Sequence, residues 1–366
     1  TPLGAPSEAL LSAAAEAIAS SLDAPTVPRL VLVGGFLAES LSSPGNLDIS
    51  PTGAEAHLGV IAANDKAPLV ALSAQALDRA VVVRASQADN AVVELVHVGV
   101  PGHGGAQTRV LIVAEASREL TVVEQFLDIG GDPSWVNAVT EVSVGPNAEV
   151  QHVQVLDGGA GSTRTGNLTA HVERDGRFKS HVVSLGGRIG RSEVLVRLIG
   201  QGASCHLDGL YVAHGDAVLD HYTEVEHVAT HTTSDEVYKG VISDTATGGF
   251  VGRVLIHEGA IKSETHQLNN NLLLSAGAVV HTRPQLEIDN DDVAATHGST
   301  VGQLDEGAIF YLRSRGLDAA KAQALMTWAF VKAQIDRLPT AGLRDQVARA
   351  VAARLNVDPS WLGDLT

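Results

Sequence analysis

The chain has 366 residues, of which 45% are hydrophobic and only 4% aromatic, and a formal net charge of −17. Negative charge of this size repels phosphate backbones and anionic lipid surfaces, so neither nucleic acid nor a membrane is an expected partner. The single cysteine, Cys205, excludes an internal disulfide framework and any metal site with several thiolates from this chain alone. We expect a cytoplasmic protein, since no apolar run reaches the roughly 18 residues of a membrane span and no secretory leader pattern opens the chain.

Residues 1–80 are predicted to form a short α/β segment. Ser7 can cap a helix that runs to about Leu22, residues 29–33 are typical of a strand, and residues 68–80 favour a second helix. The first helix has an apolar face formed by Leu10, Leu11, Ala14, Ala17 and Ile18. Because the chain begins with Thr1 and not Met, we expect this segment to be truncated.

Residues 81–300 are predicted to form the β core. Short runs rich in β-branched residues, such as VVVRAS, VELVHV and RVLIVAE, are separated by corners that contain glycine. Five of these corners begin at Gly145, Gly202, Gly215, Gly259 and Gly277, and their intervals of 57, 13, 44 and 18 residues show no strict repeat. Many short strands with small residues at the corners suit a β-solenoid and a β-sandwich equally well.

Residues 301–366 are predicted to be helical. A first helix follows Asp305 and stops at Gly316, and a second begins at Asp318 and closes at Pro339. The second helix is expected to present one face made of Ala322, Leu325, Met326, Ala329, Phe330 and Ala333. A third is expected to present Leu343, Val347, Val351 and Leu355. These apolar faces must dock on the end of the β body or bind another protein.

The strongest candidate for chemistry is His297, which lies where strand alternation gives way to helical spacing. Imidazole is a borderline ligand that suits iron, and the neutral ring binds metal directly. We expect the neighbouring Gly298 to remove a side chain that would crowd the site. A structural histidine that hydrogen-bonds a solenoid corner is an equally weighted alternative.

Four further histidines, His214, His221, His227 and His231, are close in sequence but lack the thiolates or carboxylates at firm spacings that closed metal sites need. We therefore interpret them as part of a polar face of the β body. For Cys205 we favour a small buried residue over a reactive thiol.

Several motifs together resemble the SufB/SufD family of iron–sulfur cluster assembly proteins, and SufD is the nearer of the two. They are the Tyr-Lys-Gly run at 238–240, GGFVGR at 248–253, QLNNNLLLS at 267–275, PQLEI at 284–288, THGSTVG at 296–302 and FYLRSRG at 310–316. This specific match covers residues 238–332. Arg253 stands where the family often has lysine, and Ala295 where many SufD relatives have cysteine.

The resemblance implies a mainly β fold, a right-handed parallel β-helix with the three segments 1–80, 81–300 and 301–366. It implies a non-catalytic scaffold of the SUF system that pairs with a SufB-like subunit through its last strands, and a possible homodimer when isolated. His297 would contribute to a transient Fe–S cluster at that interface, with sulfur ligands from SufB, and no cofactor would be bound permanently by this chain. The helical tail would bind the SufC-like ATPase with Asp305, Tyr311, Arg313 and Arg315, although bracing of the tail against the solenoid is favoured for the last three.

The competing prediction is a carbohydrate-active enzyme on a β-helix, a lyase or hydrolase. Such enzymes cluster Asp, Lys or Arg on one sheet and follow a secretory leader, and the sequence predicts neither feature. The chain also lacks an ATP-binding loop, because GGRIGRS at 186–192 has neither the spacing nor the lysine of that motif. We therefore expect ATP hydrolysis to take place on a partner.

Overall fold

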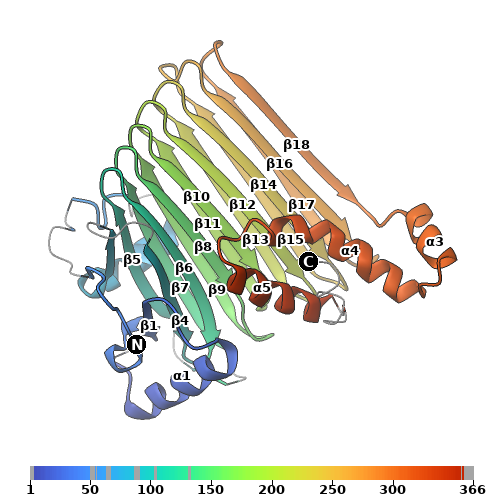
Figure 1. Ribbon diagram of the computed structural model, residues 1–366, viewed down its shortest axis with the longest axis horizontal. Helices are drawn as coiled ribbons and strands as arrows, with labels where there is room; N and C mark the ends of the chain where they lie inside the picture. Colours follow the sequence, from blue (N-terminus) through green and yellow to red (C-terminus); the bar gives the residue numbers. More distant parts are fainter. Residues whose placement is uncertain are drawn as a thin grey trace.

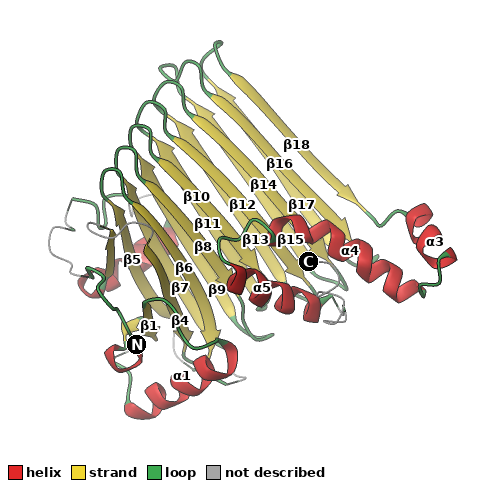
Figure 2. Ribbon diagram, in the orientation of Figure 1, coloured by secondary structure: helices red, strands yellow, loops and turns green. Residues whose placement is uncertain are grey.

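The fold consists of two parallel sheets between which the chain passes at every corner (Figures 1 and 2). The computed structural model describes residues 4–49, 54, 56–62, 67–85, 91–102, 105–130, 133–355 and 357. From β3 onward, odd-numbered strands belong to an eight-stranded sheet and even-numbered strands to a ten-stranded sheet. This alternation is that of a parallel β-helix, which confirms the solenoid over the sandwich. In the described ranges no helix is long and apolar enough to span a membrane.

The ten-stranded sheet comprises β1 (Arg29–Val33), β2 (Phe36–Leu37), β4 (Ala91–Gly99), β6 (Glu119–Asp128), β8 (Glu149–Leu156), β10 (Arg177–Ser184), β12 (Ser204–Ala213), β14 (Thr233–Ile242), β16 (Glu264–Leu273) and β18 (Ala294–Gly302). The eight-stranded sheet comprises β3 (Val81–Ala85), β5 (Ala106–Ala114), β7 (Trp135–Val144), β9 (Thr163–Val172), β11 (Ile189–Leu198), β13 (Val218–His227), β15 (Thr247–Ile256) and β17 (Val279–Ile288). The helices are α1 (Glu8–Ser21), α2 (Pro68–Ser73), α3 (Glu306–Ser314), α4 (Ala319–Ile335) and α5 (Ala341–Arg354), with 3₁₀ turns η1 (Glu39–Leu41) and η2 (Ala74–Arg79).

Register explains why the glycine intervals look irregular. Partners on successive turns lie 26 residues apart between β9 and β11 and 32 apart between β15 and β17, and the other turns fall between these limits. Intervals of 57 and 44 residues therefore correspond to two turns and to one and a half turns, and 13 and 18 each correspond to about half a turn. All five glycines lie at corners, so they follow a repeat whose length drifts.

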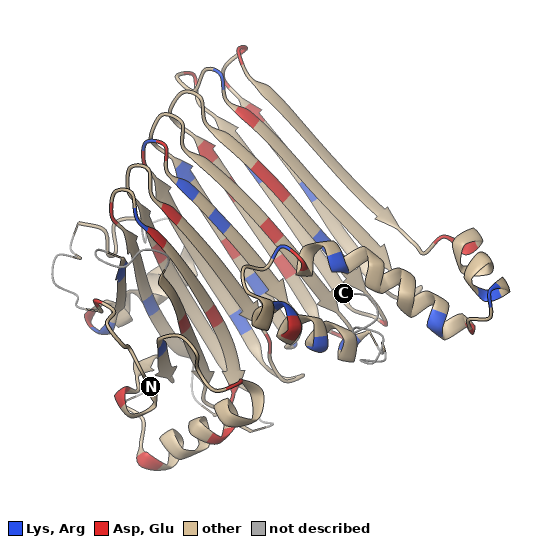
Figure 3. Cartoon of the chain, in the orientation of Figure 1, with Lys and Arg blue, Asp and Glu red and all other residues tan. Residues whose placement is uncertain are grey.

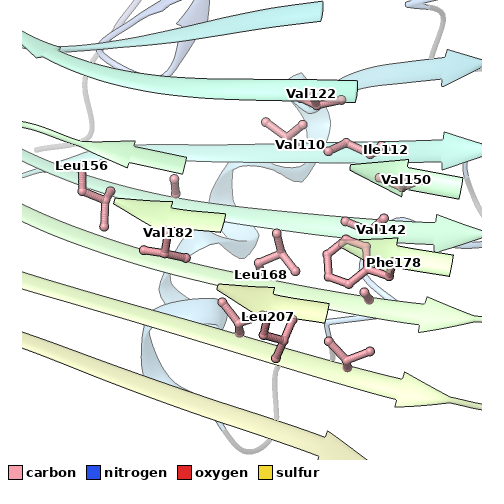
Figure 4. Packing of buried hydrophobic residues seen from close by; sticks show 14 of the residues in the cluster. Val110, Ile112, Val122, Val142, Val150, Leu156, Leu168, Phe178, Val182 and Leu207 are labelled. Carbon is pink, nitrogen blue, oxygen red and sulfur yellow. The ribbon is translucent and has the colours of Figure 1, made fainter. Parts of the chain in front are cut away.

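The interior of the solenoid is filled by aliphatic side chains from both sheets (Figure 4). Inward positions alternate with outward ones along each strand, so residues in register form columns that run along the solenoid. Val122, Val142, Val150 and Leu168 are among the residues that pack in these columns with almost no exposed surface. Valine and leucine of adjacent turns therefore supply the main apolar burial of the fold.

Helix caps confirm most of the helical predictions. The Ser7 side chain accepts a hydrogen bond from the Leu10 backbone and caps α1, and Asp318 accepts one from Lys321 and caps α4. The predicted helix at 68–80 is split, because only α2 is α-helical and η2 continues it as a 3₁₀ helix. These elements are local, and local caps and periodicity are sufficient to predict them.

The two C-terminal helices pack on the flank of the ten-stranded sheet, and not on the end of the solenoid. Trp328, Val331 and Ile335 of α4 and Val347 and Val351 of α5 are buried in this contact. They cover outward residues of the even-numbered strands, among them Val153, Val183, Leu210, Val212 and Val241. The expectation of docking on the solenoid end is wrong, because these strands present a broad apolar outer surface that the sequence pattern did not distinguish from interior positions.

The predicted buried face of α4 is also wrong in part. Ala329 and Ala333 are exposed, while Gln334 is buried and its Nε2 donates a hydrogen bond to the Val237 carbonyl at 3.1 Å. Lys239 Nζ donates to the Phe330 carbonyl at 2.8 Å. Polar pairs with β14 thus help to set the rotation of the helix, and a hydrophobic pattern does not reveal them. For α5 the predicted face is confirmed at its first three positions, and Leu355 is half-buried.

Candidate functional site

The last turn of the solenoid, formed by β17 and β18, is open. Val279 and Ile288 are each 42% exposed and Val301 is 49% exposed, which is unusual for β-strand valine and isoleucine in this fold. β18 is an edge strand without any charged residue (Figure 3). Proteins usually protect long edge strands with charge, proline or a covering element, so an unprotected edge is suited to pairing with another chain.

His297 lies on the inward-facing side of this final turn. It is in register with Gln267 of β16, whose side chain is fully buried inside the solenoid. Two residues further along β18, Ser299 Oγ is 2.8 Å from Thr282 Oγ1 of β17, on the other side of the interior. His297 is nevertheless exposed, because no further turn covers it. The imidazole is therefore located at the mouth of the solenoid interior.

Gly298 does not make room for the imidazole. Successive residues of a strand point to opposite faces, so a side chain at this position would lie on the outer face. A Cβ added there would be 3.2 Å from Leu268 Cδ1 of the neighbouring strand. The expectation that Gly298 clears space beside His297 is wrong, and the glycine instead leaves room for Leu268.

Behind His297 the interior becomes polar. Gln267 Nε2 donates a hydrogen bond to Glu236 Oε1 at 3.2 Å, and Thr223 Oγ1 donates to Glu236 Oε2 at 2.6 Å. Burial raises the pKa of Glu236 to about 7, against the lowering effect of these two hydrogen bonds. Either protonation state leaves Oε1 free to accept from Gln267, so this pair persists across neutral pH.

A groove of about 550 Å³ runs along the outer face of the ten-stranded sheet toward the same end. Its lining includes Lys179, His206, Asp235, His266 and Thr296, which occupy one outward column from β10 to β18. His266 Nδ1 is 2.8 Å from Thr296 Oγ1, next to His297 in sequence. A line of titratable groups therefore leads along the outside of the sheet to the open edge.

His206 holds part of this groove together as a cation. Its Nε2 is 2.9 Å from Asp208 and its Nδ1 is 3.0 Å from Asp235, and these two contacts raise the pKa of His206 to about 9. Arg337, just after α4, lies 2.5 Å from Asp208. The cluster therefore ties the end of α4 to β12.

This arrangement predicts a pH dependence. A pKa raised in the folded state means that His206 contributes stability in full below pH 6.5, its ordinary value, and loses it as the pH rises through about 9. The melting temperature of the wild type should therefore fall between pH 7 and 9 by more than that of His206→Gln. Thermal melts followed by circular dichroism test this, with His214→Gln, at an exposed corner, as the control that should follow the wild type. Parallel curves for wild type and His206→Gln would contradict the assignment.

The four clustered histidines do not form a polar face, so that interpretation is wrong. His221 and His227 are buried, the first 2.8 Å from Ser184 Oγ and the second 2.8 Å from Thr232 Oγ1, and burial lowers the pKa of each to about 4. His214 and His231 lie at the corners that flank β13. Both buried rings are satisfied by neighbouring hydroxyl groups, as structural histidines are.

Cys205 is a small buried residue, as predicted. It is 5% exposed and packs in the main core. Burial raises the pKa of its thiol well above the ordinary value, with Glu236 and Asp235 acting in the same direction. A reactive thiolate is not expected under these conditions.

α3 projects from the body beyond β18 (Figure 1) and packs on α4. Asp305 is its N-cap and accepts hydrogen bonds from Gly307 and Ala308 at 2.7 and 3.2 Å. Phe310 is 73% exposed and Tyr311 is 56% exposed, and the Arg315 guanidinium lies over the Tyr311 ring at 5.2 Å. Arg313 and Arg315 are also exposed. The prediction that these residues brace the tail against the solenoid is wrong, because α3 projects away from the sheets.

Among the described residues, no group of three or more His, Cys, Asp and Glu side chains could hold a metal ion. His297 is thus a single nitrogen donor at an open edge, and it can complete a site only if further ligands come from another chain. Ala295, two residues earlier on the same face, adds no donor.

A family model described as SUF system FeS cluster assembly, SufBD core domain, matches residues 96–330, from β4 into α4. The chain belongs to the SufB/SufD family. It is 32% identical over 237 residues to the iron–sulfur cluster assembly protein SufD of Escherichia coli, covering 65% of this chain and 56% of that protein. It is 28% identical over 254 residues to SufD of Bacillus subtilis, covering 67% and 57%. A SufBD family protein of Mycobacterium tuberculosis is 29% identical over 280 residues, covering 74% and 70%.

SufB/SufD membership confirms the resemblance inferred from the motifs and leaves the carbohydrate-active alternative without support. The chain spans 52–56% of the length of three of these curated relatives. The matched core contains His297 and the final turn but ends before α5. The names of the relatives describe assembly proteins rather than enzymes.

The residues that motif reading missed are Glu236 and Gln267. Gln267 begins the QLNNNLLLS motif, which marked the family without suggesting a role for the glutamine. Its signal is a polar residue at an inward strand position. That signal becomes legible only when the register places it directly behind His297.

Proposed function

We propose that the chain is a cytoplasmic, SufD-like scaffold subunit of the SUF machinery, on which an iron–sulfur cluster is assembled as cargo at a seam with a SufB-type subunit. The chain supplies no catalytic step of its own, and ATP hydrolysis is assigned to a SufC-type ATPase. The observation that carries the proposal is the open final turn, where an uncharged edge strand and an exposed imidazole lie together.

The edge of β18 supports pairing with a SufB-type subunit. Its outer backbone groups have no neighbouring strand in the ten-stranded sheet, and a second β-helix can continue the sheet through main-chain hydrogen bonds. The same contact would enclose His297 and bring sulfur ligands from the partner to the ring nitrogen. In the absence of that partner, the edge would favour a homodimer.

The exposed side of α3 supports binding of the ATPase. Phe310 and Tyr311 form an aromatic pair on a helix that projects from the body, and large exposed aromatic residues are typical centres of protein interfaces. Arg313 and Arg315 flank this pair with positive charge. Asp305 contributes indirectly, since it caps the helix that carries the pair.

Co-expression with SufB-type and SufC-type proteins of the same genome tests both contacts, with the purification tag on this chain. His297→Ala should retain both partners but lower the iron and sulfide recovered by at least about tenfold, since even outer contacts of metal ligands have effects of this size. Phe310→Asp should lose the ATPase and retain the SufB-type subunit. Val60→Asp, at a residue that is 58% exposed on the N-terminal segment, is the matched control that should retain both.

Unchanged cluster recovery with His297→Ala would remove this residue from the site, and retention of the ATPase by Phe310→Asp would remove α3 from that contact. Truncation after Asp305 is a poorer test than a point substitution. It would uncover the apolar outer surface of the even-numbered strands that α4 and α5 bury, so loss of binding could reflect aggregation.

A further inference from the structure

Three inward-facing polar residues stack in register at the open end of the solenoid. Glu236 of β14 pairs with Gln267 of β16, and Gln267 pairs with His297 of β18. The first two are fully buried, and His297 is the first member of the column that reaches solvent. One turn earlier the same column contains Leu207, so an apolar residue is compatible with this position of the turn.

The Gln267 amide has a defined orientation. Its Nε2 donates to Glu236 Oε1 at 3.2 Å, and Glu236 is itself held by Thr223. Turning the amide over would place two acceptor oxygens against each other. Gly252 of β15 provides the space for this amide, because a Cβ at that position would be 2.3 Å from Gln267 Nε2.

This orientation leaves one unused group. Gln267 Oε1 is buried and has no hydrogen-bond partner among the residues that the structure describes. A buried acceptor without a partner lowers stability by about 1–3 kcal/mol. The next residue in the column is His297, on a strand that lies about 4.8 Å away in a parallel sheet. An imidazole N–H is the donor that this oxygen can accept from.

We propose that Gln267 is a positioning residue for His297, and that its Oε1 accepts the ring N–H and so selects the nitrogen that presents a lone pair to the cargo. A neutral imidazole has one N–H and one lone pair, and the partner of the N–H decides which nitrogen is free. Gln267 lies outside the motif that contains the histidine, and it would act only through His297. The inference rests on the proposed function for the identity of the cargo, but not for the contact itself.

The contact is tested in the full chain labelled with ¹⁵N-histidine, at about pH 8, well above the ordinary pKa of imidazole. Long-range ¹H–¹⁵N spectra report the tautomer of His297, whose signals are assigned by their loss in His297→Ala. One tautomer should dominate in the wild type, and Gln267→Met, which removes the acceptor but keeps the length, should give a mixture. Gln267→Leu is a second variant in case the first does not fold. Thr265→Val, at the adjacent inward position of β16, should leave the tautomer unchanged.

A wild-type mixture of tautomers, or an unaltered single tautomer in folded Gln267→Met, would overturn the contact. In the co-expressed complex, Gln267→Met should lower cluster recovery by about tenfold while both partners remain bound. The two proposals fail separately. If the tautomer depends on Gln267 but His297→Ala has normal cluster recovery, the contact stands and the proposed function falls. If His297→Ala loses the cluster and the tautomer is independent of Gln267, only the positioning role falls.

Discussion

Replacing Glu124 by leucine is expected to lower the free energy of unfolding by about 3–5 kcal/mol at pH 7, because it removes one partner of a buried charged group. Glu124 of β6 has no exposed surface, and it lies 3.2 Å from His97 Nε2 and 3.1 Å from His152 Nε2. Thr140 donates a further hydrogen bond to it at 2.6 Å. Without the carboxylate, two imidazoles and a hydroxyl remain in the interior without their partner.

The pKa of Glu124 fixes the sign of its pH dependence. Burial alone would raise this pKa, but the interactions with His152 and His97 outweigh burial and hold it well below the ordinary value. The contribution of the carboxylate is therefore present in full above about pH 4.5 and is lost as the pH falls below it. The wild type should lose more stability than Glu124→Leu on acidification.

Urea unfolding and hydrogen exchange of β4 to β8 measure this effect, since a solenoid can open by groups of turns. Glu119→Ala, on the exposed part of the same strand, should change stability by less than about 0.5 kcal/mol. Replacing Glu124, His97 and His152 together by leucine should recover much of the loss. A loss below about 1 kcal/mol for Glu124→Leu would show that the cluster is not a coupled unit.

Trp328→Ala should lower the free energy of unfolding of the helical flank by about 3–5 kcal/mol. Trp328 is 4% exposed and packs between α4 and the outer face of the ten-stranded sheet. Its Nε1 is buried and has no hydrogen-bond partner among the described residues, so Trp328→Phe keeps much of the packing and removes the unsatisfied N–H. We therefore expect Trp328→Phe to stay within about 1 kcal/mol of the wild type.

Hydrogen exchange of the α4 and α5 amides tests the expected loss in Trp328→Ala. Protection should fall in both helices and remain unchanged in the interior strands, because the flank and the solenoid interior are separate apolar clusters. Equal losses for alanine and phenylalanine would contradict a packing role. Ala329→Ser, at an exposed position of the same helix, is the control.

Local features of the chain could be read directly from the sequence. Ser7 and Asp318 were identified as caps because capping depends on a hydroxyl or carboxylate a few residues from its backbone donors. The solenoid was favoured over a sandwich only through the family motifs, since both folds share strand composition. His297 was singled out from a change of period and from a motif, and the structure places it at an exposed edge without testing its role.

The face of each residue and the partner of each strand were decided by the tertiary structure. Turns of 26 to 32 residues have no fixed period, and a shift of one residue reverses every side chain between interior and exterior. Only the assembled register shows that Gly298 faces Leu268, that α4 packs through Trp328 and Gln334, and that Glu236 and Gln267 stand behind His297. The sequence by itself determined the elements and the family, because these depend on neighbours along the chain. The open end and its polar column depend on contacts about thirty residues apart, which only the folded sheets specify.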